Sequence, residues 1–388
     1  MISEHLKMEF CGARFLLVPG HLGYIGGAER QSLILAASLL NQIDCRVDVL
    51  GWGGQDGIFA EALRDIGIEP VVFPWDFEAH GLRRAVNAIR LARFIRSTLR
   101  PDYILPFATY HCKVIGSIWR WTGARFAWWN QRDEGRCLHG TRTEQRLMRS
   151  LPAIVSNSWE GRDFLIRKFS LPNDRVRVIN NGVEIPEDVG PSDWRPRLGM
   201  ADDELLFTMT ANLTPFKDHL TLLRAFAKLR ESEIGRTCRL ALAGRHDETT
   251  QQIKSLAFDL GLCGKLLLTG VVPMNEIGSL LQATDAVVHS SIKEGCPNSA
   301  LEAMAHARCV LGTEISGMRQ ALGDEAADLY LAPPGDSDRL AELMRQMAED
   351  PARRAAAGQA NCNRVRTEFS VEKMTQAVLQ TILDHRIR

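Results

Sequence analysis

The segment AVVHSSIKEGCPNSALEAMA, residues 286–305, decides the predicted fold. Its first four residues form a short apolar run typical of a buried strand, and its last eight have a helical pattern. Between them lies a turn made of Gly295, Cys296, Pro297 and Asn298. Proline is favoured in the first turn of a helix, so we expect the helix to begin at Pro297 or at the residue beside it. A strand, a tight turn and a helix are the repeating unit of a parallel α/β sheet.

The same unit recurs in both directions from this segment. Strands are predicted at 14–18, 46–50, 69–73, 103–106, 126–129 and 153–156, and again at 205–210, 239–243, 265–269, 286–289 and 309–311. Helical stretches such as 26–40, 57–66 and 82–99 separate them. This alternation predicts an α/β protein with parallel, doubly wound, Rossmann-like sheets.

The alternation breaks between Glu184 and Pro191, in a stretch rich in proline, glycine and acid that is typical of a linker. We therefore expect an N-terminal domain over residues 1–190 and a C-terminal domain over residues 191–370. Residues 371–388 are predicted to form a further helix. Two such domains are expected to face each other across a cleft, where small molecules usually bind.

The composition is that of an ordinary globular protein. The 388 residues are 45% hydrophobic and 24% charged, which excludes a disordered, collagenous or coiled-coil chain. Lys+Arg and Asp+Glu both number 47, so the overall charge does not point to nucleic acid. The nine cysteines are scattered singly, which favours a reducing, cytosolic compartment over a disulfide framework or a zinc site. Neither a signal peptide nor a transmembrane helix is predicted.

The turn in the opening segment carries the strongest functional signal. The backbone from Gly295 to Ser299 is expected at a helix N-terminus, which attracts anions. Glu294 precedes this turn and Glu302 lies about one turn into the helix, with seven residues between them. A carboxylate can accept two hydrogen bonds from vicinal hydroxyls of a sugar. The arrangement predicts a nucleotide-sugar ligand, whereas helix capping would explain each glutamate separately but not both together.

Two other strand ends carry weaker signals. Four glycines lie between Gly20 and Gly27, and Gly26-Gly27 opens a predicted helix, so this loop either approaches an anion closely or makes a tight turn. In the second domain, Asp218 is a predicted N-cap after the strand at 205–210. Lys217 beside it either neutralises phosphate or is a solvated lysine at a helix start.

Taken together, these motifs resemble glycosyltransferase family 4, retaining enzymes of the GT-B fold. Residues 294–305 are similar to the family's E-x7-E signature, and residues 26–30 to its first-strand loop. Residues 156–158 and 178–183 resemble the end of its first domain. Residues 212–218 resemble its phosphate-contacting segment and residues 332–336 a late loop. The resemblance extends across most of the chain.

The resemblance implies a role for each matching residue. Lys217 is expected to bind the donor diphosphate, Glu302 the ribose hydroxyls and Glu294 the transferred sugar. In this family the leaving phosphate assists deprotonation of the acceptor, so no enzymic nucleophile is required. The helix at 371–388 is expected to pack back on the N-terminal domain. Further donor contacts are expected from Gly26, Gly27, Gly295, Cys296, Pro297, Asn298 and Ser299.

The chain departs from the family pattern at two places. The family commonly has an arginine where this chain has Asn212, and we expect Arg245 either to compensate or to be a surface arginine. The family's usual histidine after the strand at 126–129 is absent from the sequence that follows, where Asn130, Arg132 or Glu134 is expected to face the sugar instead. Arg132, Asp133 and Glu134 are the candidate acceptor-binding residues.

No metal or other cofactor is expected besides the nucleotide-diphosphate sugar, which is the donor substrate. Asp336-Ser337-Asp338 spells DxD, a divalent-cation motif of other glycosyltransferases. Because it follows Pro333-Pro334-Gly335 and begins a predicted helix, helix capping is the favoured interpretation.

A basic region lies in the first domain. From Arg83 to Arg149 there are 14 Lys/Arg against 4 Asp/Glu, a local net charge of +10. The predicted helix at 82–99 combines several arginines with apolar residues, and tryptophans lie nearby in sequence. This pattern fits either a solvated basic face, which we favour, or peripheral contact with an anionic membrane.

The resemblance therefore implies a metal-independent hexosyltransferase that moves a sugar, with retention, to a saccharide or lipid-linked acceptor in cell-surface polysaccharide or glycolipid synthesis. The donor is expected on the second domain and the acceptor on the first. The expected location is the cytoplasm or the cytoplasmic face of a membrane. Two alternatives stay open: a sugar-nucleotide epimerase or hydrolase of the same fold, and a catalytically degenerate nucleotide-binding scaffold.

Overall fold

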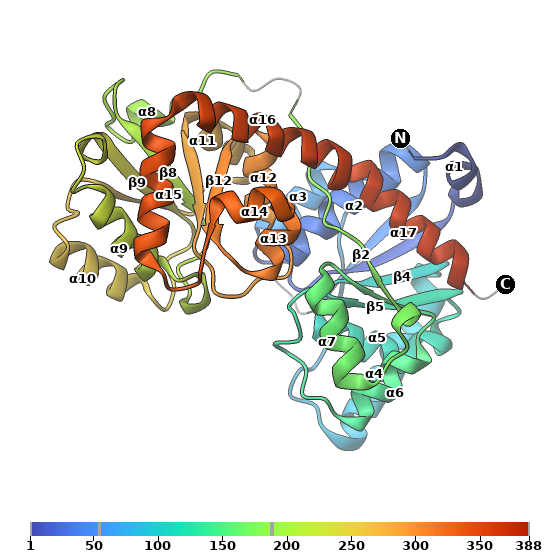
Figure 1. The fold of residues 1–388 in the computed structure, drawn as a ribbon. Coiled ribbons are helices and arrows are strands. Elements are labelled where there is room, and N and C mark those ends of the chain that lie inside the picture. The colour runs from blue at the N-terminus through green and yellow to red at the C-terminus, as the bar shows by residue number, and fades with distance from the viewer. Residues whose placement is uncertain (1, 53–55, 187–189, 387–388) are drawn as a thin grey trace. The chain divides into compact units, whose positions relative to one another are not determined.

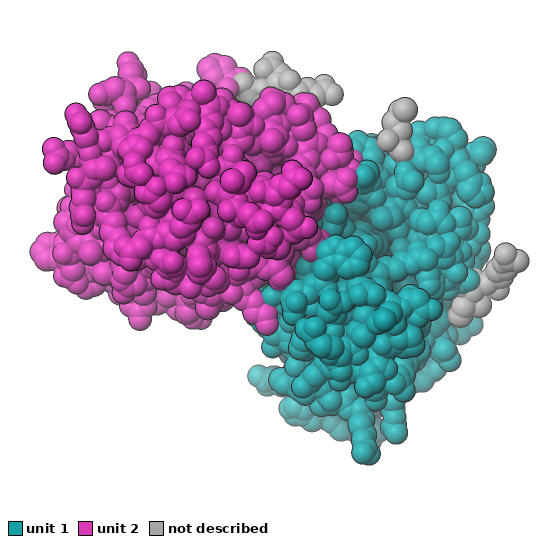
Figure 2. All heavy atoms as spheres, viewed as in Figure 1, with its two compact units in different colours: residues 1–182, 371–388 teal, residues 183–370 magenta. Residues whose placement is uncertain are grey.

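The computed structural model describes residues 2–52, 56–186 and 190–386, and the chain divides into two compact units (Figure 1). Unit 1 comprises residues 1–182 and 371–388, and unit 2 comprises residues 183–370, shown in teal and magenta in Figure 2. The change of unit falls between Gly182 and Val183 rather than at residue 190. Residues 187–189 of the predicted linker and residues 387–388 of the predicted last helix lie outside the described residues.

Unit 1 contains a seven-stranded sheet in the order β3-β2-β1-β4-β5-β6-β7, and all of its pairings are parallel. The predicted doubly wound parallel sheet is therefore confirmed. The three-residue strand β7 was not predicted, because so short a run has no readable period. The strands are β1 (Arg14–Val18), β2 (Arg46–Trp52), β3 (Val71–Phe73), β4 (Tyr103–Pro106), β5 (Phe126–Gln131), β6 (Ala153–Ser156) and β7 (Val176–Val178).

Helices bury both faces of this sheet. Leu16 belongs to the core cluster on one face, while Phe15 packs against Phe10 of the first helix on the other. The last helix, α17, packs on α2, where the Thr375 hydroxyl lies 2.8 Å from that of Ser38. The helices of unit 1 are α1 (Glu4–Phe10), α2 (Gly27–Ile43), α3 (Ile58–Asp65), α4 (Gly81–Phe94) with a π-helical continuation (Ile95–Leu99), α5 (Thr109–Thr122), α6 (Arg142–Ser150), α7 (Trp159–Phe169) and α17 (Val371–His385).

Unit 2 contains a six-stranded parallel sheet in the order β10-β9-β8-β11-β12-β13. Successive residues of β8 enter different core clusters: Leu206 lies in one, and Phe207 and Met209 lie in the other. A strand that is apolar on both faces must be covered on both, as parallel sheets are. The strands are β8 (Leu205–Thr210), β9 (Cys238–Ala243), β10 (Leu266–Gly270), β11 (Ala286–His289), β12 (Cys309–Thr313) and β13 (Leu331–Ala332).

The helices of unit 2 complete its two outer layers. Helix α15 begins at the DxD triplet, where a helix start was predicted, and it packs on α9. The helices are α8 (Trp194–Arg197), α9 (His219–Leu229), α10 (Thr250–Asp259), α11 (Ile277–Ala283), α12 (Asn298–Ala305), α13 (Ser316–Leu322), α14 (Asp324–Tyr330), α15 (Ser337–Glu349) and α16 (Pro351–Glu368).

Each sheet has one point at which the strand order reverses. In unit 1 this point lies between β1 and β4, and in unit 2 between β8 and β11. At such a point the loops leaving the carboxyl ends of the two strands diverge and open a crevice, which is where open α/β sheets bind ligands. The topology therefore directs the search for a site to these two pairs of loops.

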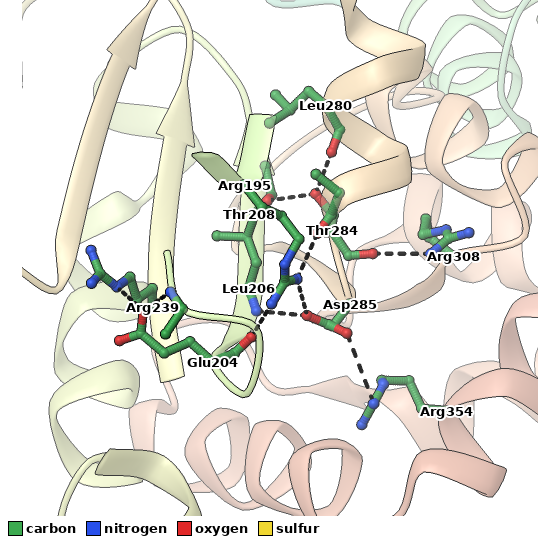
Figure 3. A network of polar contacts seen from close by, with 12 residues as sticks. Arg195, Glu204, Leu206, Thr208, Arg239, Leu280, Thr284, Asp285, Arg308 and Arg354 are labelled. Carbon is green, nitrogen blue, oxygen red and sulfur yellow. Dashed lines mark hydrogen bonds and ion pairs between the residues drawn. The ribbon is translucent and has the colours of Figure 1, made fainter. Parts of the chain in front are cut away.

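The opposite, amino edge of the unit 2 sheet is held by a network of polar contacts (Figure 3). Asp285, directly before β11, accepts hydrogen bonds from the Leu206 backbone N–H at 2.8 Å and from Arg195 at 3.3 Å. The Thr208 and Thr284 hydroxyls lie 2.8 Å apart, and Arg308 donates to the Thr284 carbonyl. These contacts join β8 to the residues directly before β11.

In the part of the chain that the structure describes, none of the nine cysteines forms a disulfide bond. Within the described ranges, no helix combines the length and the apolar character that crossing a membrane requires.

Candidate functional site

Lys217 and Glu294 meet at the carboxyl edge of the unit 2 sheet, where the strand order reverses. Lys217 ends a short 3₁₀ turn after β8, and Glu294 lies in the loop after β11. The Lys217 Nζ contacts Glu294 Oε1, and the Ser291 hydroxyl donates to the same oxygen at 3.0 Å. Only 16% and 15% of the two charged side chains is exposed. The structure thus brings together two candidate site residues that lie 77 positions apart in the sequence.

Lys217 and its neighbours keep Glu294 ionised. Burial raises the pKa of the Glu294 carboxyl, but the Lys217 ammonium, the nearby His289 ring and the hydrogen bonds from Lys217 and Ser291 together outweigh burial and hold that pKa below its ordinary value. At neutral pH Glu294 is therefore a carboxylate, paired with Lys217 in a site of restricted solvent access. Both groups can interact with a ligand more strongly there than they would in bulk water.

Backbone contacts hold the two loops in register. The Ile292 N–H donates to the Phe216 carbonyl at 2.9 Å, and the Ser290 hydroxyl donates to the Lys217 carbonyl at 3.0 Å. Gly317 of α13 lies so close that a Cβ atom there would be 2.4 Å from the Glu294 carbonyl oxygen. A larger residue at position 317 would push this turn away, so glycine is required by close approach.

Two buried histidines flank the Lys217–Glu294 pair and were missed by the sequence analysis. His289 ends β11 with its Nε2 3.6 Å from Glu294 Oε1, and His219 begins α9. Burial lowers the pKa of His289 to about 4 and that of His219 to about 3, so both rings are neutral at pH 7. In the part of the chain that the structure describes, neither ring has a hydrogen-bond partner. The sequence could have indicated them, because one ends a predicted strand and the other begins a predicted helix, where ligands bind in such sheets.

Helix α12 begins at Asn298 with Pro297 as its N-cap, which confirms the predicted helix start. Pro297 itself provides no side-chain hydrogen bond to this end of the helix. Glu302 lies within α12 with 7% of its surface exposed, and Cys296 in the turn is equally buried. The candidate donor residues from Gly295 to Ser299 thus form the turn and first residues of a helix beside Glu294, an arrangement suited to an anion.

Asn212 and Arg245 are neighbours at the ends of β8 and β9. The Arg245 backbone N–H donates to Asn212 Oδ1 at 3.1 Å. The Arg245 guanidinium forms a 2.7 Å ion pair with Asp247, and about half of its side chain is exposed. Arg245 is thus near the position where the family's arginine is missing, with its charge shared by a carboxylate.

The predicted N-caps are confirmed. Asp218, at a φ of 47°, accepts a hydrogen bond from the Thr221 N–H, and Asp336 accepts one from the Arg339 N–H at 2.9 Å. Asp336 of the DxD triplet therefore caps α15. The Lys228 ammonium contacts Asp338, the second acid of this triplet, at 2.6 Å.

In unit 1, the glycine loop after β1 is shaped by Glu29, which the sequence analysis did not single out. Glu29 is 5% exposed, and its carboxylate accepts hydrogen bonds from the His21 N–H at 3.0 Å and the Gly26 N–H at 3.1 Å. A Cβ atom on Gly20 would lie 2.3 Å from Glu29 Oε1. Gly26 is the N-cap of α2 and Gly27 its first residue, so these two predicted donor residues form a turn around a buried acid.

The candidate acceptor residues follow β5 in unit 1. Arg132 donates to Asn181 and, with Asn130, lines a small cavity between β5, β6 and α17. Asp133 accepts hydrogen bonds from within its own loop and from Thr109 at 3.2 Å. Glu134 is 4% exposed and has a φ of 51°, a conformation that is costly for a glutamate and that recurs at functional sites.

The predicted site residues therefore form two groups. In unit 2 the structure brings Lys217 to Glu294, the turn from Gly295 to Ser299 follows Glu294 directly, and Glu302 lies buried in the helix that this turn begins. Asn212 and Arg245 lie together at the ends of β8 and β9. In unit 1 it places Gly26 and Gly27 after β1, and Arg132, Asp133 and Glu134 after β5.

Family models match both parts of the chain. "Glycosyl transferases group 1" matches residues 192–364, and "Glycosyltransferase Family 4" matches residues 25–186. A D-inositol 3-phosphate glycosyltransferase of Frankia alni is 30% identical over 216 residues, covering 52% of this chain and 53% of the relative. An uncharacterised glycosyltransferase of Methanocaldococcus jannaschii is 29% identical over 171 residues, covering 42% and 43%. The chain thus spans about half the length of these relatives.

Solved structures share the fold over nearly the whole chain. Anabaena HepE, in complex with UDP and glucose, has a TM-score of 0.80 at 20% identity, covering 96% of this chain and 100% of the other. A glycosyltransferase of Rickettsia africae has a TM-score of 0.77 at 18% identity, covering 96% and 98%.

Proposed function

Because the chain belongs to glycosyltransferase family 4 and has the two Rossmann-like units of the GT-B fold, we propose that it transfers a sugar from a nucleotide-diphosphate donor to a saccharide or lipid-linked acceptor with retention. Unit 2 would bind the donor and unit 1 the acceptor. The role we propose is in cell-surface polysaccharide or glycolipid synthesis.

The Lys217–Glu294 pair carries this proposal. An ammonium group of restricted exposure beside the start of α12 can neutralise a diphosphate, and the helix N-terminus adds its own attraction for anions. The neighbouring carboxylate of Glu294 is an acceptor for hydroxyl groups of the transferred sugar. Glu302, on the same helix, would accept hydrogen bonds from the ribose.

In the proposed reaction the bond between the sugar C1 and the diphosphate oxygen breaks, and a bond between C1 and an acceptor oxygen forms. The proton of the acceptor hydroxyl goes to the leaving diphosphate. Charge develops on that leaving group in the transition state, so Lys217 and the α12 amides act where stabilisation lowers the barrier. No metal is needed in this scheme, because the protein itself supplies the positive groups.

Unit 1 offers polar groups for the acceptor. Asn130 and Arg132 lie at the carboxyl end of β5, and the strained, buried Glu134 lies two residues farther along. A saccharide presents many hydroxyl groups, and neighbouring arginine, amide and carboxylate side chains can satisfy both their donors and their acceptors. We propose Arg132, Asp133 and Glu134 as the residues that orient the acceptor.

Two findings on similar proteins support a nucleotide-sugar donor and a polyhydroxyl acceptor. Structures of Anabaena HepE were solved with UDP and with UDP-glucose. The relatives from Frankia alni and Stackebrandtia nassauensis are D-inositol 3-phosphate glycosyltransferases.

The first test is thermal stabilisation by a panel of nucleoside diphosphates and their sugars. We expect one nucleotide to stabilise the wild type, by about 2.7 kcal/mol at a concentration of 100 times Kd, and the shift to be lost in Lys217→Ala and Glu302→Ala. Lys228→Ala is the matched control, because it removes another lysine ion pair of unit 2, with Asp338. No shift with any nucleotide, or a shift retained in both site variants, would contradict the donor site.

The second test is product analysis with the nucleotide sugar that binds. Transfer predicts that release of nucleoside diphosphate depends on an added saccharide or lipid-linked acceptor, and that the new linkage keeps the donor's anomeric configuration. Release or isomerisation of the sugar without an acceptor would identify a hydrolase or epimerase. Binding without turnover across an acceptor panel would identify a scaffold.

A further inference from the structure

We propose that the outward face of α4 in unit 1 docks on an anionic lipid bilayer. The surface belongs to unit 1, whereas Lys217 and Glu294 belong to unit 2. The inference does not rest on the proposed function. It starts from three large apolar side chains that α4 turns to solvent: Leu82 is 81% exposed, Val86 48% and Ile89 43%.

The three side chains form one stripe. Residues four and three positions apart lie on the same face of a helix, so Leu82, Val86 and Ile89 are aligned. The opposite face of α4 is the one that packs on the unit, because Asn87 and Leu91 are buried there. The stripe is therefore the solvent face of α4 and not an extension of the core. Phe77, in the loop before α4, is 54% exposed and adds a further apolar group to this region.

Arginines surround the stripe, and no acidic residue balances them within the helix. Residues 81–100 contain six arginines and neither aspartate nor glutamate. Arg90, Arg93 and Arg96 are exposed, and among the described residues none of them has an ion-pair or hydrogen-bond partner for its side chain. The charge is thus available to an external anion. Arg83, by contrast, forms an exposed ion pair with Asp76.

The neighbouring helices continue the basic region. α5 packs on α4 and α6 packs on α5. Arg96 lies within van der Waals distance of the Gly123 position at the end of α5, and Trp121, two residues before that glycine, is 57% exposed. Helix α6 adds three exposed arginines: Arg142, Arg146 and Arg149.

The apolar stripe and the arginines together match the acyl chains and the anionic headgroups of a lipid bilayer. Apolar side chains on a helix lying in the plane of a membrane enter the boundary between headgroups and acyl chains, and arginines beside them meet anionic headgroups. A solvated basic face, which the sequence favoured, does not account for three exposed apolar side chains in register with the arginines. Charge complementarity therefore selects an anionic bilayer as the occupant.

The test is flotation of the purified chain with vesicles of phosphatidylcholine alone, and with vesicles of equal parts phosphatidylcholine and phosphatidylglycerol. We expect binding to the anionic vesicles only, and weaker binding as salt is raised. Each arginine near such a surface strengthens binding roughly fivefold, so reversal of three charges in Arg90→Glu, Arg93→Glu and Arg96→Glu should weaken it by at least about 100-fold. The matched control reverses three exposed arginines of unit 2, at Arg224, Arg236 and Arg366.

A second variant tests the apolar stripe. Leu82→Ser with Ile89→Ser should weaken vesicle binding roughly tenfold without lowering the melting temperature, because both side chains are already exposed. The proposal is overturned if the wild type does not float with anionic vesicles, or if the charge reversals on α4 act no more strongly than those on unit 2. It is also overturned if sedimentation shows that the stripe variant abolishes self-association while vesicle binding is unchanged, because a second copy would then be the partner.

Discussion

The two edges of the unit 2 sheet use polar side chains of low exposure in opposite ways. At the amino edge, Asp285 is matched by the Leu206 N–H, by Arg195 and, at 3.9 Å, by Arg354 (Figure 3). At the carboxyl edge, His289 and His219 are buried without hydrogen-bond partners among the described residues, next to a charged pair at the strand-order reversal.

The difference distinguishes polar groups that stabilise the fold from polar groups that serve a binding site. A buried polar group that is fully hydrogen-bonded stabilises the fold, whereas one that lacks partners costs free energy. Such costs are tolerated where a site must interact with something outside the fold. The comparison therefore predicts that variants at the amino edge change stability but not donor binding, and that variants at the carboxyl edge do the reverse.

The largest effect on stability is expected for Asp285→Ala. It leaves the Leu206 N–H and Arg195 without their carboxylate, and we expect a loss of about 2–4 kcal/mol in the free energy of unfolding, because the side chain is only 24% exposed. Urea denaturation measures this loss. Asp338→Ala is the control: its side chain is 83% exposed and pairs with Lys228, so its loss should cost less than about 1 kcal/mol. Loss of nucleotide binding by folded Asp285→Ala would break the comparison.

An intermediate, pH-dependent effect is expected at Glu204. Its ion pair with Arg239 at 2.7 Å, together with Lys265 at 2.8 Å, lowers the pKa of Glu204 to about 2 from a model-peptide value of 4.5. A carboxyl with a lowered folded-state pKa contributes stability above its unfolded value and loses that contribution as the pH falls. Glu204→Gln should therefore be less stable than the wild type by about 1–2 kcal/mol at pH 7, and the two should converge between pH 4.5 and 2.

Denaturation curves of both proteins across that pH range provide the measurement. A gap between wild type and Glu204→Gln that stays constant with pH would show that packing, not the carboxylate charge, is what Glu204 contributes.

The smallest effect, and the one of opposite sign, is expected for His289→Leu. Replacing a neutral, buried ring that has no hydrogen-bond partner with an apolar side chain should leave stability unchanged or raise it by about 0.5–1 kcal/mol. Thermal unfolding measures this change, and the nucleotide-induced shift in the same variant reports on the site. A clear loss of stability would show that His289 stabilises the fold, as the hydrogen-bonded groups of the amino edge do.

Local patterns in the sequence were sufficient for most of the fold. Apolar runs gave correct positions for strands such as β1, β4, β8 and β11. A parallel strand that is covered on both faces consists almost entirely of apolar residues, so it is recognisable in the sequence. The caps Asp218 and Asp336 and the start of α12 beside Pro297 were also predicted, since each depends on residues within one helical turn. The three-residue β7 was missed because it is held by its neighbour β6.

The sequence by itself determined the chemistry that is local to one strand end: Glu294, the turn after it and Glu302 follow one another within a single strand–turn–helix unit. Only the tertiary structure decided which distant groups meet there. Lys217 contacts Glu294 because β8 and β11 are adjacent where the strand order reverses, although 77 positions separate the two residues. Likewise, the exposed stripe on α4 became visible only once packing showed which of its apolar side chains the core had left out. Strand pairing and burial are set by long-range packing, which one-dimensional periodicity does not encode.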